Sequence, residues 1–112
     1  MNAPIVITNV TLVNGIDAPK CVDVRMAGGH IADITGPNEL AAVDGTRING
    51  DGQFLVPGLW ESHTHMMLGI DGSFDDKVSG VKRSLQQYLP RGITSVVDLG
   101  CPEDVMNGVR SD

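Results

Sequence analysis

Two histidines separated by one residue, His63 and His65, are the side chains whose type and spacing best suit chemistry. They end an apolar stretch that begins at Leu59 and predicts a short strand, and residues two apart on a strand project from the same face. Two neutral imidazoles on one face can bind one divalent cation, because zinc and similar metals accept histidine nitrogen at about 2.0–2.1 Å. The pattern indicates a metal site, although it can also be a coincidence or two histidines beside a loop with no ligand.

Two carboxylates, Glu61 and Asp98, are further candidates, and no residue of this chain is assigned as catalytic. Glu61 has the same strand parity as the histidines, so we expect it to point inward beneath them. It either orients an imidazole or is a buried acid paired with another group. Asp98 ends the next predicted strand, where it either contacts substrate or a ligand or caps the following loop.

The elements that must position these residues begin only after residue 56. Residues 1–56 alternate β-branched runs with turn dipeptides, which predicts a small β unit. Its hairpin turns at Gly28-Gly29 and has one polar face, which carries Asp23 and Arg25. The predicted strands are Ile5–Val13, with apolar residues on both faces, then Val22–Met26, His30–Thr35, Thr46–Asn49 and Gln53–Val56.

Residues 57–112 follow a different pattern, typical of a strand, a helix and a second strand. Leu59–His63 and Ile93–Leu99 are the predicted strands, the second apolar enough for a parallel sheet. Between them, apolar residues recur every three or four positions from Phe74 to Leu89, and Ser73 is placed to cap that helix. The sequence thus predicts a βαβ unit whose first strand carries the histidines.

Composition and charge exclude several classes of function. The chain has 8 Lys and Arg against 14 Asp and Glu, a net charge of −6 that disfavours nucleic acid as a partner. Since no run approaches the roughly 18 apolar residues of a spanning helix, we expect no membrane partner. Cys21 and Cys101 are far apart and form no Cys-x-x-Cys pair, which predicts reduced thiols. A secretory signal begins with a positively charged region, but no Lys or Arg precedes Lys20. We therefore expect a cytoplasmic protein.

The stretch Leu55–His65, Leu-Val-Pro-Gly-Leu-Trp-Glu-Ser-His-Thr-His, resembles the signature of the amidohydrolase superfamily. Ile7–Gly15, Gly28–Pro37 and Gly92–Gly100 are similar to the family's opening strand, hairpin and second barrel strand. Pro57–Trp60 and Val97–Gly100 look most like the imidazolonepropionase-like and prolidase-like members. The resemblance implies an α/β fold in which residues 1–56 form an N-terminal β-sandwich segment. Residues 57–112 would then be the first βαβ of an incomplete (β/α)8 barrel.

The same resemblance implies a metal-dependent hydrolase. His63 and His65 would bind the more buried metal of a mononuclear or binuclear centre, with zinc the expected ion. A metal-activated water would hydrolyse an amide, cyclic amide or dipeptide C–N bond of a small-molecule substrate. The family supplies its other ligands, a carboxylated lysine or glutamate and two histidines, and its aspartate base from later strands. Glu61 stands where the family usually has aspartate, and its side chain is longer by one methylene group.

The length of the chain departs from the family. About 55 residues follow Pro57, whereas a complete barrel of this type needs roughly 200 or more. We therefore expect a fragment of a longer protein, inactive and weak in metal binding by itself. The alternative is a non-catalytic β-rich binding or assembly module that keeps the family fold. In either case bare apolar faces predict a homo-oligomer.

Overall fold

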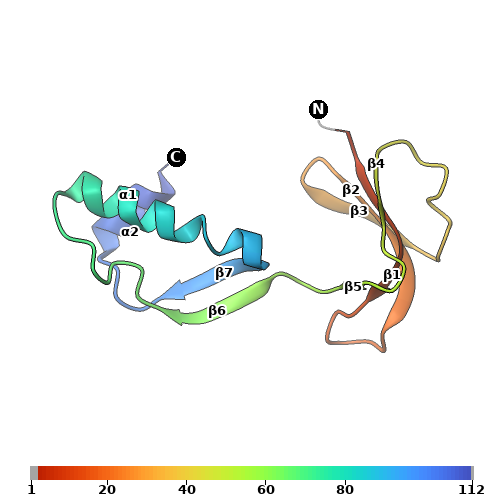
Figure 1. The fold of residues 1–112 in the computed structure, drawn as a ribbon, viewed down its shortest axis with the longest axis horizontal. Helices are drawn as coiled ribbons and strands as arrows, with labels where there is room; N and C mark the ends of the chain where they lie inside the picture. The colour runs from red at the N-terminus through yellow and green to blue at the C-terminus, as the bar shows by residue number, and fades with distance from the viewer. Residues whose placement is uncertain (1–2, 112) are drawn as a thin grey trace. The chain divides into compact units, whose positions relative to one another are not determined.

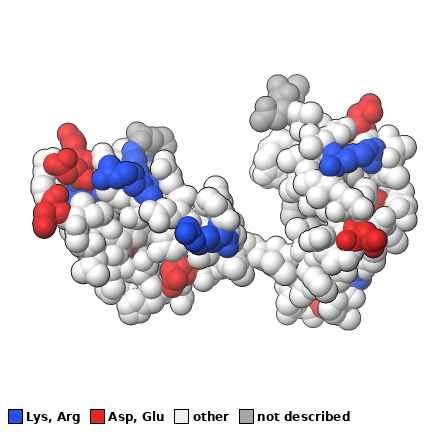
Figure 2. All heavy atoms as spheres, in the orientation of Figure 1, with Lys and Arg blue, Asp and Glu red and all other residues white. Residues whose placement is uncertain are grey.

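The computed structural model describes residues 3–111, which divide into two compact units (Figure 1). Unit 1 runs to Pro57 and unit 2 begins at Gly58. Together they form a mixed α/β fold that is rich in strands. None of the described helices has the length and apolar composition that crossing a membrane requires. On the face shown in Figure 2, acidic and basic side chains are interspersed, so the excess negative charge is not gathered into one patch there.

Unit 1 is one mixed sheet with two antiparallel and two parallel strand pairings. Strand β1 pairs antiparallel with β2 and parallel with β4 and β5, and β2 pairs antiparallel with β3, which gives the order β3-β2-β1-β4. Gly28 and Gly29 adopt left-handed φ angles of 59° and 80°, as the predicted hairpin turn requires. The strands are β1 Ile5–Leu12, β2 Lys20–Ala27, β3 His30–Thr35, β4 Thr46–Asn49 and β5 Phe54–Leu55.

A bulge in β1 decides which apolar residues share a face. Ile7 pairs with Val24 but Val10 pairs with Val22, so β1 contains one extra residue, and Asn9 has a φ of 56°. Ile7 and Val10 therefore contact the same core cluster despite their odd spacing. Because side chains alternate along a strand, the fully buried Val6 lies on the opposite face from Ile7. Simple alternation along the sequence would have placed Ile7 and Val10 on opposite faces of the sheet.

The polar face of the β2–β3 hairpin is covered where Asp23 lies. Its side chain is completely buried, with Oδ1 accepting the Asn9 N–H at 2.9 Å and Oδ2 the Leu40 N–H at 3.0 Å. Burial raises the pKa of Asp23, but the backbone donors of these two residues and of Asn38 outweigh it and hold the pKa below its ordinary value of 3.8. The buried carboxylate thus fastens the segment after β3 onto the sheet.

Unit 2 contains the predicted βαβ unit and a second helix. Strands β6 Leu59–Thr64 and β7 Ile93–Asp98 pair in parallel, and α1 Phe74–Leu85 connects them through the 3-10 turn η1 Leu89–Arg91. The predicted Ser73 cap is confirmed by a capping box with Asp76.

Two parts of unit 2 differ from the sequence prediction. Helix α1 ends four residues before Leu89, since the chain continues as η1 with Pro90 and a left-handed Gly92. Helix α2, Glu103–Arg110, was not predicted at all, and it packs beside α1 on the same side of the two strands (Figure 1). Met66, Val81 and Val105 form the buried centre of this unit. In the described residues unit 1 is one sheet and unit 2 is one βαβ unit followed by a helix, so the sandwich and the barrel remain predictions.

Candidate metal centre

The carboxyl end of β6 brings the two predicted histidines together. His63 is in the strand and His65 follows its last residue, Thr64. Their Nε2 atoms are 3.2 Å apart, and the ring centroids are 5.1 Å apart with an angle of 73° between the ring planes. Both side chains are exposed. The rings therefore converge through Nε2 at a surface that solvent reaches.

This separation fits two ligands of one cation. Two nitrogens at 2.0–2.1 Å from a tetrahedral zinc lie about 3.3–3.4 Å from one another, close to the 3.2 Å observed. The same distance suits a hydrogen bond between one protonated and one unprotonated Nε2. Within residues 3–111 no group of three or more His, Cys, Asp or Glu side chains could hold a metal. The described site therefore offers two imidazole nitrogens, and their role as metal ligands stays a prediction.

Glu61 is turned toward the backbone of its own strand. Its Oε1 accepts the N–H of His63 at 3.2 Å, and the side chain is half-buried. The irregular register of β6 against β7 between Glu61 and Thr64 accompanies this contact. Of the two expected roles, the structure shows neither a hydrogen bond to an imidazole nor an ion pair for Glu61 among the residues described, and it shows a backbone contact instead.

Asp98 caps the loop after β7, one of its two expected roles. Oδ1 accepts the N–H groups of Gly100 at 2.9 Å and Cys101 at 3.1 Å, and Oδ2 accepts the N–H of Met66 at 3.1 Å. Met66 directly follows His65, so the carboxylate joins the ends of both strands. These three donors occupy both oxygens.

Sequence reasoning missed the contact that fixes the residue between the histidines. Thr64 Oγ1 is 3.0 Å from the hydroxyl of Tyr88, just beyond α1. Strand alternation could have placed Thr64 on the face opposite His63 and His65, but its partner depends on the fold of the connection. Because of this bond, the opposite face of β6 is fastened to the helical layer.

Cys101 is a second group without an assigned role in the sequence analysis. Burial raises the pKa of its thiol, and the charges of Asp98 and Asp104 raise it further. A thiol with a raised pKa is mostly protonated at neutral pH and is a poor nucleophile or ligand. These surroundings shift the Cys101 thiol toward its protonated form.

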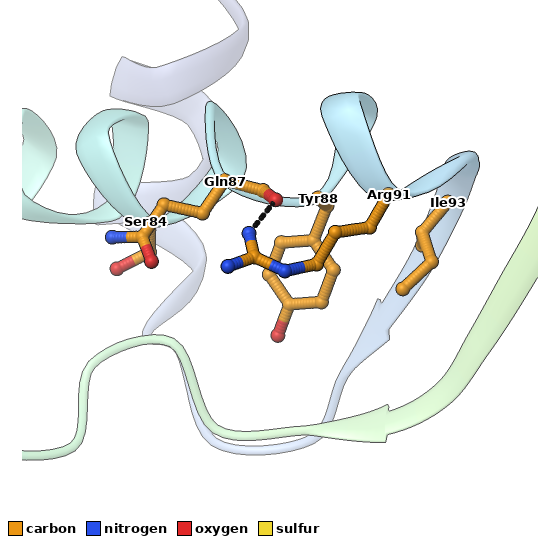
Figure 3. A pocket seen from close by; sticks show the side chains of 5 residues that line it. All are labelled: Ser84, Gln87, Tyr88, Arg91 and Ile93. Carbon is orange, nitrogen blue, oxygen red and sulfur yellow. Dashed lines mark hydrogen bonds between the residues drawn. The ribbon is translucent and has the colours of Figure 1, made fainter.

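The cavity drawn in Figure 3 lies between the end of α1 and the start of β7. It has a volume of about 310 Å³ and is lined by Ser84, Gln87, Tyr88, Arg91 and Ile93, the last of which begins β7. The Arg91 guanidinium donates to the backbone carbonyl of Gln87, as the dashed line shows. Neither histidine lines this cavity.

The chain is similar to known proteins in both sequence and structure. No family model matches it. It is 31% identical over 105 residues to dihydropyrimidinase 1 of Caenorhabditis elegans, covering 92% of this chain and 20% of that protein. It is 30% identical over 92 residues to D-aminoacylase of Alcaligenes xylosoxydans xylosoxydans, covering 81% and 17%. The chain thus spans about a fifth of the length of these curated relatives.

Among solved structures, a Xaa-Pro dipeptidase with bound methionine in its active site matches 96% of this chain and 29% of its own, with a TM-score of 0.78 and 17% identity. The resemblance to the N-terminal portion of amidohydrolase superfamily proteins is confirmed. At this identity the dipeptidase shows a shared fold. The amidohydrolase resemblance was carried by the segment from Leu55 to His65, which spans the junction of the units and all of β6.

Proposed function

We propose that this chain is the N-terminal part of a metal-dependent amidohydrolase. Residues 1–56 would contribute a segment of a β-sandwich, and residues 57–112 the first βαβ of a (β/α)8 barrel. The whole enzyme would hydrolyse the C–N bond of an amide, a cyclic amide or a dipeptide. The observation that carries the proposal is the convergence of the His63 and His65 Nε2 atoms, 3.2 Å apart, at the carboxyl end of β6. Active sites of parallel βα folds gather at that end of the strands.

In this proposal His63 and His65 hold a divalent ion, with zinc the first candidate. Such an ion lowers the pKa of a bound water toward about 7 and polarises a carbonyl. For their part, the two histidines present unprotonated Nε2 atoms, which requires each imidazole to carry its proton on Nδ1. Glu61 and Asp98 act on the backbone around them through the N–H groups of His63 and Met66. The further ligands and the base would come from later barrel strands, so we expect the 112-residue chain to be inactive.

The nature of the substrate rests on the relatives. Dihydropyrimidinase, D-aminoacylase and Xaa-Pro dipeptidase are names of hydrolases that act on small molecules, and we extend that class to this chain. The imidazolonepropionase-like or prolidase-like subgroup stays part of the proposal. So does a cytoplasmic location, which is supported by the two free cysteines, Cys21 and Cys101.

A non-catalytic assembly module is the second candidate, favoured by the exposed apolar surface of unit 1. Ile34 pairs with Val24, a member of the buried core cluster, yet Ile34 is 48% exposed. Ile48 pairs with Ile7 on the same face and is 47% exposed. Contiguous apolar surface of this kind favours association, and homo-oligomers are expected under both candidates.

Titration of the 112-residue chain with Zn²⁺ by isothermal calorimetry tests the enzyme proposal. Two ligands leave a tetrahedral ion half-coordinated, so we expect one weakly bound ion that dialysis removes. The double variant His63→Ala/His65→Ala should lose this binding, and His30→Ala, the remaining histidine, should keep it. The enzyme proposal is overturned if the wild-type chain shows no Zn²⁺ binding that depends on His63 and His65. The assembly module would remain.

A further inference from the structure

The loop after β7 reaches the His65 ring at Gly100. A Cβ placed on Gly100 would be 2.6 Å from His65 Nδ1, 3.5 Å from Cε1 and 3.6 Å from Cγ. Real Cβ atoms do not approach a ring nitrogen so closely. Gly100 is outside the left-handed region of backbone angles, so only this contact, and not the backbone, disfavours a side chain there.

The Asp98 carboxylate fixes both sides of this contact. Through Oδ1 it holds the N–H of Gly100, and through Oδ2 it holds the N–H of Met66, the residue after His65. A further backbone bond, from the N–H of Leu99 to the carbonyl of Thr64 at 3.0 Å, joins the same two loops. The His65 backbone and the Gly100 backbone are therefore held at a set separation by groups that touch neither imidazole.

We propose that Asp98 and Gly100 are positioning residues for the metal ligand His65. Gly100 lies against the Nδ1 side of the ring, while the Nε2 atom faces His63 at 3.2 Å. A backbone held in place on the Nδ1 side limits rotation of the imidazole and keeps the two Nε2 atoms converged before any ion arrives. Asp98 acts through backbone amides and contacts no substrate. The inference depends on the proposed metal role of His65.

The variant Gly100→Ala tests the close approach, and Asp98→Asn tests the carboxylate. The methyl group added by Gly100→Ala must displace the His65 ring. The side-chain amide introduced by Asp98→Asn can accept hydrogen bonds through one oxygen only, so either the loop or Met66 is released. Outer partners of metal ligands commonly change affinity by about 10–100-fold, and we expect Gly100→Ala to weaken Zn²⁺ binding by at least tenfold. Leu99→Ala is the matched control, because Leu99 lies in the same loop, is 57% exposed, and keeps its backbone bond.

Two readouts separate positioning from general stability. Calorimetric Zn²⁺ titrations are made well below the melting temperature of each variant, where a merely structural effect leaves Kd unchanged. In the metal-free chain, long-range ¹H–¹⁵N NMR spectra of the imidazoles should shift for His63 and His65 in Gly100→Ala and stay constant in Leu99→Ala. The wild-type chain should also show a nuclear Overhauser effect between Gly100 Hα and His65 Hε1, a result that needs no variant.

The outcomes distinguish the inference from the function on which it rests. Wild-type chain that binds no Zn²⁺ through His63 overturns the proposed function. The positioning role alone is overturned if Zn²⁺ binding depends on the histidines but Kd is equal for wild type and Gly100→Ala. It is also overturned if the Gly100–His65 Overhauser effect is absent. If Asp98→Asn fails to fold, Gly100→Ala and the Overhauser effect still decide.

Discussion

Replacing Asp23 with asparagine should reveal how much a single buried carboxylate contributes to unit 1. The two Asp23 oxygens each accept one backbone N–H, from Asn9 and from Leu40, inside a fully buried site. Asparagine keeps one acceptor oxygen and turns a second donor toward the other N–H. Hydrogen bonds to charged groups contribute about 1.5–3 kcal/mol, and an unsatisfied buried donor costs about 1–3 kcal/mol. We therefore expect Asp23→Asn to lower the free energy of unfolding of unit 1 by about 2–3 kcal/mol at pH 7.

The pH dependence of this difference follows from the lowered pKa. The folded-state pKa of Asp23 is below its ordinary value of 3.8, so the carboxylate stabilises the folded state most above that ordinary value, which the unfolded chain keeps. That contribution is lost as the pH falls through the folded-state pKa. The gap between wild type and Asp23→Asn should thus be constant from about pH 5 to 7 and shrink below about pH 4.

Urea titrations followed by NMR at the amides of β1 and β2 measure this difference, because these amides report on unit 1. Asp33→Asn is the matched control on the same sheet: Asp33 pairs with Arg25 at 2.6 Å, with 40% of its side chain exposed. Exposed ion pairs contribute about 0–1 kcal/mol, so this variant should change stability little. Equal stability of the Asp23 and Asp33 variants at pH 7, or a gap that persists undiminished at about pH 2.5, would refute the reasoning.

Two other features of the structure give measurable expectations. The exposed Cys21 should react with a disulfide reagent at pH 8 faster than Cys101, because burial and two neighbouring carboxylates raise the pKa of the Cys101 thiol. The Cys21→Ser chain should retain only the slow phase of this reaction. Equal reaction rates for the two thiols would contradict the expectation. Val81→Ala removes two fully buried methyl groups from the contacts with Met66 and Val105 and should lower the free energy of unfolding of unit 2 by about 2–3 kcal/mol. In urea titrations, the half-exposed Val97→Ala should cost less than about 1 kcal/mol, and a Val81→Ala cost as small as that would contradict the packing described.

Local patterns predicted much of the fold. The bounds of β3 and β4, the Gly28-Gly29 turn and the Ser73 cap depend on residues close in sequence, and all agree with the structure. The bulge at Asn9 was not predicted, because a left-handed angle at a residue other than glycine leaves no periodic signal. Helix α2 was missed because it spans only eight residues after Pro102, too few for apolar periodicity to stand out.

Within the candidate site, strand parity predicted that His63 and His65 share a face, and their Nε2 atoms do converge. Parity could not show the acceptors and donors that come from elsewhere in the chain. The partners of Asp98 depend on how the ends of β6 and β7 align, and the Glu61 carboxylate accepts the His63 N–H where the register of these strands shifts. The sequence thus predicted the candidate ligands, whereas the groups around them depend on the parallel pairing of β6 with β7.

The two faces of β6 make different contacts, and these contacts oppose changes of strand register that would separate the two histidines. On one face Thr64 is bonded to Tyr88, and on the other His63 meets His65. Because successive side chains alternate, a slip of one residue in β6 would put Thr64 at the site and send both imidazoles toward the helices. The Thr64–Tyr88 bond opposes that slip, and the Asp98 bond to Met66 opposes fraying of the chain just after His65. Convergence of the histidines is therefore a property of the whole βαβ unit, and it can exist before any further ligand is supplied.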